Sequence, residues 1–130
     1  PRLEVYLQFD SLNDDALVDL RGARLSRIRQ QALEALEAAG LATTLVVVVK
    51  KGVNDHEIPD IIRHALTWAC VRGVTFQPVQ DAGRNEGFAA KANRMLPSEI
   101  RRAVARSGVF RCPATRLRFP SATACVRARR

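Results

Sequence analysis

An unbroken run of apolar residues at positions 45–49 limits what this chain can fold into more than any other feature of its sequence. The run reads Leu-Val-Val-Val-Val and offers no polar residue to either face of an extended strand. It therefore predicts a strand that is buried on both sides, as the strands of parallel sheets are. Parallel strands need long crossover connections, usually helices, so strands and helices are expected to alternate along the chain.

Two further strands are predicted, one before and one after this run. The first spans 3–9 and is closed by Asp10 and Ser11, and the third spans 74–77 and is terminated by Pro78. The crossovers between the three strands are long enough to force parallel, right-handed connections. Both half of a barrel and a small open sheet fit this order.

The first crossover is predicted to hold two helices. Asn13 is a suitable N-cap for a short helix that reaches Leu20, and Gly22 can end it. A longer helix follows at 25–39, with Gly40 as its C-terminal stop. The apolar residues of this helix recur at helical spacing and predict one buried stripe, made of Ile28, Ala32, Ala35, Leu36 and Ala39.

The second crossover is predicted to be a single helix. Asn54, followed three residues later by Glu57, resembles a capping box, and Pro59 lies early enough in the helix not to break it. The helix is expected to run to about Val71. Its inward-facing residues are then Ile58, Ile61, Ile62, Ala65, Leu66 and Ala69.

Residues 1–107 are expected to form one α/β domain. After the third strand, a loop is predicted at 84–94 and a last helix from Pro97 to about Ser107. Residues 108–130 have no helical or strand periodicity and no acidic residue, so they are expected to be an irregular basic tail. The predicted fold is thus a parallel β-α-β-α-β unit, followed by a loop and a C-terminal helix.

The net charge of +8 belongs to the end of the chain. Residues 1–80 carry a net charge of −1, whereas residues 81–130 carry +9. The strand-and-helix region therefore has no electrostatic case for binding nucleic acid, and the tail has only a nonspecific one, since Phe110 and Phe119 are its aromatic residues. Either a basic arm or an artificial or frame-shifted end accounts for the tail, and the abrupt change of charge favours the second.

Cysteines and histidines predict no disulfide framework and no metal site. Cys70, Cys112 and Cys125 are odd in number and at least 13 residues apart, and Cys70 is expected to be a small buried residue on a helix. His56 and His64 are eight residues apart rather than the four of a helical zinc pair. No segment reaches the roughly 20 apolar residues of a membrane span, and the expected location is the cytoplasm.

Polar residues recur where the predicted strands end. Asp10 and Ser11 follow the first strand, Asn54 lies just beyond the second, and Gln77 ends the third. Because parallel α/β sheets bind ligands at the carboxyl ends of their strands, these residues predict one shared binding site. None of them has the pattern of a stand-alone catalytic residue.

Four motifs in this order resemble the second half of the core domain of radical S-adenosylmethionine (radical SAM) enzymes. They are YLQFDS at 6–11, Arg21-Gly22, VKKGVNDHEI at 49–58 and FQPVQDAGR at 76–84. The likeness covers residues 3–107. It is nearest to the group with the pterin methyltransferases and tetraether lipid synthases, and looser to the molybdenum-cofactor biosynthesis protein A type. It implies strands four to six of a (β/α)6 partial TIM barrel, whose open end holds S-adenosylmethionine beside a 4Fe-4S cluster.

The resemblance also assigns residues to the cofactor site. The end of the first strand would contact the ribose, and Val46 and Val48 of the second strand would pack against adenine. Thr44, early on the second strand, takes the place of a lysine of the molybdenum-cofactor proteins. The third strand would contact the adenine edge, and a loop arginine would reach the cofactor carboxylate or the substrate. In strand order, these residues are Gln8, Asp10, Thr44, Val46, Val48, Asn54, Gln77, Val79 and Arg84. Structural roles remain open for several of them: a cap for Asp10 and Asn54, and barrel core for Val46 and Val48.

The sequence departs from the family at the cluster. The CxxxCxxC motif that binds it is absent, as is the Gly-Gly-Glu stretch for the cofactor's amino group. The chain is therefore expected to be a fragment of a methyltransferase or another radical C–C or C–H enzyme. It would be inactive alone and would need the missing N-terminal half of the barrel as its partner. The alternative is a non-catalytic α/β module that forms homo-oligomers through open sheet edges.

Overall fold

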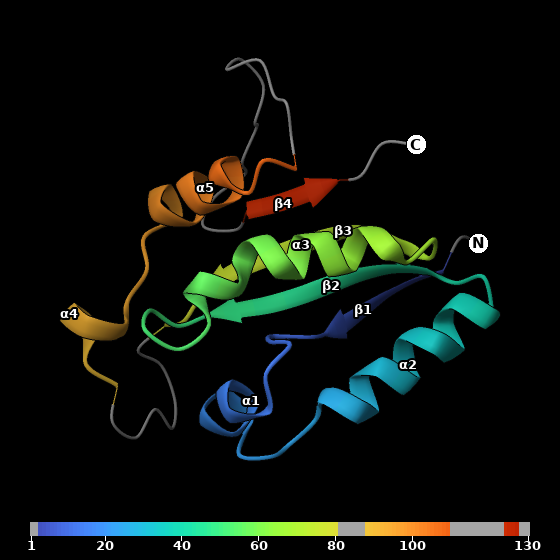
Figure 1. Ribbon diagram of the computed structural model, residues 1–130, viewed down its shortest axis with the longest axis horizontal. Helices are drawn as coiled ribbons and strands as arrows, with labels where there is room; N and C mark the ends of the chain where they lie inside the picture. The colour runs from blue at the N-terminus through green and yellow to red at the C-terminus, as the bar shows by residue number, and fades with distance from the viewer. Residues whose placement is uncertain (1–2, 81–87, 110–123, 128–130) are drawn as a thin grey trace.

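Four strands form one sheet in the computed structural model, which describes residues 3–80, 88–109 and 124–127 (Figure 1). Their order across the sheet follows the chain: β1 (Glu4–Gln8), β2 (Ala42–Val49), β3 (Val71–Pro78) and β4 (Ala124–Arg127). The first three strands are parallel, and β4 runs antiparallel to β3. Since helices alternate with the parallel strands, the predicted α/β class is confirmed, and the arrangement is that of part of a β/α barrel.

Helices fill both crossovers and follow the third strand. Between β1 and β2 lie α1 (Asp14–Arg21) and α2 (Ser26–Ala38); between β2 and β3 lie the 3-10 turn η1 (Asp55–Glu57) and α3 (Ile58–Thr67); after β3 come α4 (Ala90–Asn93) and α5 (Pro97–Arg106). Helix α1 begins and ends as predicted. The Oδ1 atom of Asn13 accepts from the Asp15 amide at 2.8 Å, and Gly22 adopts the left-handed φ of 75° that ends the helix.

One face of the sheet carries the hydrophobic core, and we call it the helix-covered face. Its β2 and β3 side chains are at most 3% exposed: Leu45, Val47, Val49, Val74 and Phe76. They share one core cluster with Leu33 of α2, Ile61 of α3 and Ile100 of α5. Figure 1 shows α3 lying in front of β3 and running alongside β2. The helices therefore bury this face of the sheet.

The opposite face, here called the open face, contributes no residue to the hydrophobic core of the described chain. Strand register and side-chain alternation place on it Glu4, Tyr6 and Gln8 of β1, Thr44, Val46 and Val48 of β2, and Thr75 and Gln77 of β3. Tyr6 is 67% exposed. We expected the 45–49 strand to be buried on both faces, and this expectation is wrong for Val46 and Val48. Both are partly exposed because the described helices pack on the other face of the sheet.

The buried stripe of α2 differs from the predicted one. Arg29 and Leu33 are its buried residues, whereas Ile28 is 57% exposed and Ala35 is also exposed. The helix is thus rotated so that a charged side chain faces inward. The reason is a buried carboxylate that needs a cation, described below.

The second crossover is shorter than predicted. Helix α3 ends at Thr67 and β3 begins at Val71, so Cys70 lies between them instead of on the helix. Cys70 is buried, as expected. Ile58, Ile61, Ile62 and Ala65 face inward as predicted, but Leu66 is exposed, and Ala69 lies beyond the helix and is exposed too.

In the predicted tail, β4 extends the sheet, although no strand was expected there. The rest of that tail, 110–123 and 128–130, lies outside the described residues. The predicted helix after the loop is confirmed as α5, and part of the predicted loop contains the short α4. Within the described ranges, no helix has the length and apolar character that crossing a membrane requires.

Candidate functional site

The carboxyl ends of the three parallel strands lie at one edge of the sheet. Gln8 is in register with Val46, and Val48 is in register with Gln77. All four side chains belong to the open face. The structure therefore brings together the residues that the family resemblance assigns to the ends of three different strands.

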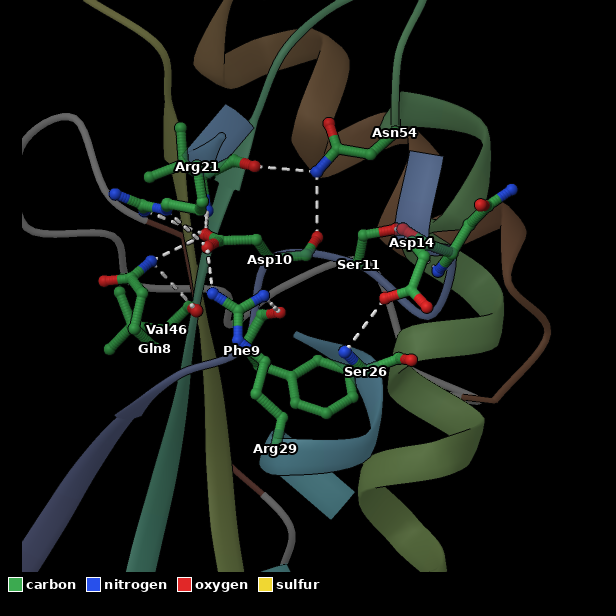
Figure 2. A network of polar contacts seen from close by, with 12 residues as sticks. Gln8, Phe9, Asp10, Ser11, Asp14, Arg21, Ser26, Arg29, Val46 and Asn54 are labelled. Atoms are coloured by element: carbon green, nitrogen blue, oxygen red, sulfur yellow. Dashed lines mark hydrogen bonds and ion pairs between the residues drawn. The ribbon is translucent and has the colours of Figure 1, made fainter. Parts of the chain in front are cut away.

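Asp10 is the centre of a polar network just after β1 (Figure 2). Its side chain is fully buried, and its carboxylate accepts five hydrogen bonds. Arg21 of α1 donates twice, at 2.7 and 3.1 Å, and Arg29 of α2 donates once, at 3.0 Å. The remaining two come from the Gln8 amide at 2.6 Å and the Val48 backbone at 2.9 Å. The network joins β1, β2 and both helices of the first crossover.

The network keeps Asp10 ionised. Burial acts to raise the pKa of this carboxyl, but the hydrogen bonds from Arg21, Val48 and Gln8 outweigh it and hold the pKa below its usual value. Burial lowers the pKa of Arg29, while the bond to Asp10 raises that of Arg21. Both guanidiniums stay charged, since arginine does not lose its proton in proteins. The carboxylate is so fully engaged that it holds the strand ends and has no lone pair to spare for a ligand.

Asn54 ties the loop after β2 to the end of β1. Its Nδ2 group donates to the backbone carbonyls of Asp10 and Val48 at 2.8 and 2.7 Å, and its Oδ1 accepts from the Lys50 amide at 2.8 Å. It makes no cap for the following helix. The predicted capping box is therefore wrong, because a fully buried amide between two strand ends satisfies backbone groups there instead.

Glu57 makes a second link between the same two loops. Its carboxylate accepts from the Ser11 hydroxyl at 2.5 Å and from the Leu12 amide at 3.1 Å. The loop after β1 is thus held both by Asn54 and by Glu57. These contacts give Ser11, Asn54 and Glu57 structural roles at the edge of the site.

Two other predicted site residues lie on or next to β3. Gln77 is exposed on the open face, where water can satisfy its amide. Val79 follows the strand, and its backbone N–H donates to the Val49 carbonyl at 2.9 Å. That N–H is therefore already used within the sheet, and a contact from Val79 to a ligand would have to come from another group.

The remaining predictions fall elsewhere. Thr44 is four residues before Val48 on β2, a separation of about 13 Å along a strand, and its hydroxyl donates to Glu4 at 2.7 Å. It is therefore not brought to the strand ends. Arg84 lies outside the described residues.

Sequence reasoning overlooked the two arginines of the network. Arg21 was noted only as part of a motif, and Arg29 was not singled out. A signal for Arg29 was present, since it lies three residues before Ala32 and seven before Leu36 and so shares a helix face with two members of the predicted stripe. A carboxylate that closes a buried strand requires a cation nearby, and Arg29 is placed to supply it.

The donor set of the described residues does not fit an iron–sulfur cluster. No group of three or more His, Cys, Asp or Glu side chains in the described part of the chain could hold a metal ion. Burial, with help from the neighbouring Glu37, raises the pKa of the Cys70 thiol to about 11, so it does not favour the thiolate that such a cluster needs.

A cavity of about 260 Å³ lies on the helix side of the sheet, and Phe9, Ser26 and His64 are among its lining residues. Because Phe9 and Gln8 alternate along the chain, their side chains point to opposite faces. The cavity is therefore separate from the strand-end residues of the open face.

Two curated proteins are similar to this chain. A 7,8-dihydro-6-hydroxymethylpterin dimethyltransferase of Methanocaldococcus jannaschii is 39% identical over 82 residues, which are 62% of this chain and 16% of that protein. A GTP 3',8-cyclase of Mesorhizobium japonicum is 30% identical over 100 residues, which are 76% of this chain and 29% of that protein. Both are radical SAM enzymes, and the chain is similar to a segment of each of them. No family model matches it.

Proposed function

We propose that this chain supplies part of the nucleoside-binding wall of a radical SAM barrel. The observation that carries the proposal is the open face, where the ends of β1, β2 and β3 gather Gln8, Val46, Val48 and Gln77. The chain is also similar to two radical SAM enzymes, of which it spans 16% and 29%, and this similarity supports the same proposal. Ligand sites in parallel α/β folds are built at this end of the strands.

Apolar and polar side chains of the open face would contact different parts of a nucleoside. Val46 and Val48 are partly exposed apolar side chains two residues apart on the same face of β2, and they suit the flat face of adenine. Gln8 and Gln77 flank them on β1 and β3 and provide hydrogen-bonding groups for the sugar and the base edge. Asp10 and Asn54 hold the strand ends in place.

The radical chemistry of the full-length enzyme would come from S-adenosylmethionine and a 4Fe-4S cluster, which together supply the electron transfer and bond cleavage. Because the described donor set does not fit a cluster, we assign cluster binding to a part of the enzyme beyond this chain. The share of this chain is to bind and orient the nucleoside and to keep water away from it. Methyl transfer or other C–C or C–H chemistry belongs to the whole protein in this proposal.

The test is a titration of the ¹⁵N-labelled 130-residue chain with S-adenosylmethionine, followed by two-dimensional NMR. We expect shifts to concentrate at Gln8, Val46, Val48 and Gln77, with little change in the core residues of the helix-covered face. Val48→Glu should abolish binding, because it places a charge where adenine packs. Leu66→Glu introduces the same side chain at an exposed site of α3 and should leave binding intact. Shifts confined to the helices, or equal effects of the two substitutions, would contradict the proposal.

A second candidate function is self-association through the open face and the outer edge of β1. Among the described strands, β1 pairs with β2 alone, so its other edge has no strand partner there. Parallel strands are normally covered on both faces, and an exposed edge favours pairing with another chain. We propose that the same surface serves either a missing half of a barrel or a second copy of this chain.

A further inference from the structure

We propose that Asp10 is a positioning residue that turns Gln8 into a pure hydrogen-bond acceptor on the open face. The inference rests on the proposed nucleoside site and specifies which ligand group Gln8 recognises. A glutamine amide ordinarily offers both donors and an acceptor, so its orientation decides which chemistry a ligand meets.

The contacts of Gln8 fix that orientation. Its Nε2 group donates to Oδ1 of Asp10 at 2.6 Å and to the backbone carbonyl of Val46 at 3.3 Å. An amide nitrogen has two hydrogens, so both donors are used inside the protein. Figure 2 shows the nitrogen of Gln8 turned toward Asp10 and its oxygen turned away. What remains for a ligand is the oxygen.

Asp10 makes the reverse orientation unfavourable. If the amide turned over, its oxygen would face a carboxylate that is ionised and a carbonyl oxygen, and neither can donate a hydrogen bond. The carboxylate itself cannot rotate away, because Arg21, Arg29 and the Val48 amide hold both of its oxygens. The orientation of Gln8 is therefore set by a rigid, fully buried group.

Two energetically unfavourable features of Asp10, its backbone conformation and its buried ion pair, support a positioning role. Asp10 is a non-glycine residue at a positive φ of 60°, and it brings a buried carboxylate and a buried guanidinium to the end of a strand. Buried ion pairs contribute little net stability compared with apolar packing, and strained backbone concentrates at functional positions. These costs are explained if the network serves to fix the orientation of Gln8, a polar side chain at the strand ends of the open face.

A ligand at Gln8 must then present a donor. A hydroxyl of a ribose meets this requirement, whereas a carboxylate or phosphate oxygen would face the amide oxygen without a proton between them. The structure thus assigns Gln8 the recognition of a hydrogen-bond donor on the ligand, such as a sugar hydroxyl, and assigns Asp10 the control of that specificity.

The experiment compares adenosine with 2'-deoxyadenosine and 3'-deoxyadenosine as probes for the full chain, with binding followed by NMR titration. We expect the wild-type chain to prefer adenosine by about three- to tenfold over at least one deoxy analogue, the effect of one hydrogen bond. Gln8→Glu should lose that preference, since the new carboxylate is repelled by Asp10 and leaves the acceptor position. Gln8 is only partly buried, so this variant should fold.

The control is Gln30→Glu, the same change on α2. Gln30 also donates its amide to a carboxylate, that of Glu34 at 3.1 Å, but it lies on α2, on the helix-covered side of the sheet and not on the open face. It should keep the preference for adenosine. Asp10→Asn, if it folds, should lose the preference, because an amide in place of the carboxylate no longer dictates how Gln8 is turned.

Three results would contradict the inference in whole or in part, and they differ in what happens to the proposed nucleoside site. If Gln8→Glu keeps or increases the preference for adenosine, an acceptor at position 8 works without being oriented by Asp10. The positioning role then fails, while the nucleoside site stands. If the wild-type chain binds none of the three nucleosides, the proposed function and the inference fail together. A wild-type chain that binds all three equally contradicts the sugar contact alone.

Discussion

His64 of α3 lies between two aromatic side chains of the helix-covered face. Its ring stacks on Phe9 at a centroid distance of 5.3 Å, and its Nε2 atom accepts a hydrogen bond from the Trp68 indole at 3.2 Å. Burial lowers the pKa of His64 from 6.5, so the folded chain holds this imidazole neutral. Protonation would also remove the acceptor that Trp68 uses.

This geometry predicts a loss of stability in mild acid. Because the pKa of His64 is lower in the folded state, the unfolded chain binds the proton more tightly. The contribution of His64 is present in full above pH 6.5 and is lost as the pH falls from there through the folded-state pKa. Urea unfolding followed by the fluorescence of Trp68, the single tryptophan, measures it. In His64→Phe the stability should change less over this pH range; an unchanged slope would contradict the prediction.

Single residues also show where reading the sequence failed. Asn54 and Glu57 match the local pattern of a capping box, yet each bonds to groups more than 40 residues away, Asp10 and Ser11. A local pattern identifies the residue types that satisfy backbone groups but not which backbone groups need them. The predicted strand-end residues were brought together because strand ends in a parallel sheet share one edge, which follows from topology alone.

At the scale of elements, the helix positions were easier to predict than their orientations. Asn13, Gly22 and Gly40 act through the local chain, and each lies at the helix boundary that was predicted for it. The inward face of α2 depends instead on Asp10, a partner outside the helix, because the bond from Arg29 to Asp10 sets the rotation. Similarly, the end of α3 was misplaced because the apolar residues at 69–71 fit a helix as well as a strand.

The rotation of α2 predicts unequal effects of two similar substitutions. Leu33→Ala removes a fully buried side chain and should lower the free energy of unfolding by about 2–5 kcal/mol. Ile28→Ala removes one that is 57% exposed and should change it by about 0.5 kcal/mol or less. Urea titrations that give midpoint and slope distinguish the two. Equal losses would mean that α2 packs through the stripe that helical spacing alone predicts.

For the molecule as a whole, the sheet is covered on one face and open on the other. The helix-covered face contains the core, while the open face exposes Tyr6 and leaves Val46 and Val48 partly accessible. This asymmetry is what half of a barrel requires, because the interior of a barrel is filled by the side chains of all its strands. It also means that the chain alone presents apolar surface beside an unpaired strand edge of its described sheet.

We therefore expect the isolated chain to self-associate as its concentration rises. Tyr6 is on β1, the strand at the open edge, and its side chain belongs to the open face. Tyr6→Lys should shift the chain toward monomer by at least severalfold in the association constant, because a lysine on an edge strand opposes strand pairing and its charge resists burial. Sedimentation velocity or light scattering over a concentration series measures the shift.

The matched substitution is Ile28→Lys, which places the same charge at an exposed apolar site on α2. It should leave association unchanged, because α2 lies on the helix-covered side and does not contribute to the open edge. A chain that stays strictly monomeric at high concentration would rule out the second candidate function. A chain whose association responds to Ile28→Lys but not to Tyr6→Lys would place the contact on the helices. Association that is reduced by Tyr6→Lys alone, and also by added S-adenosylmethionine, would show that partner and nucleoside compete for one face.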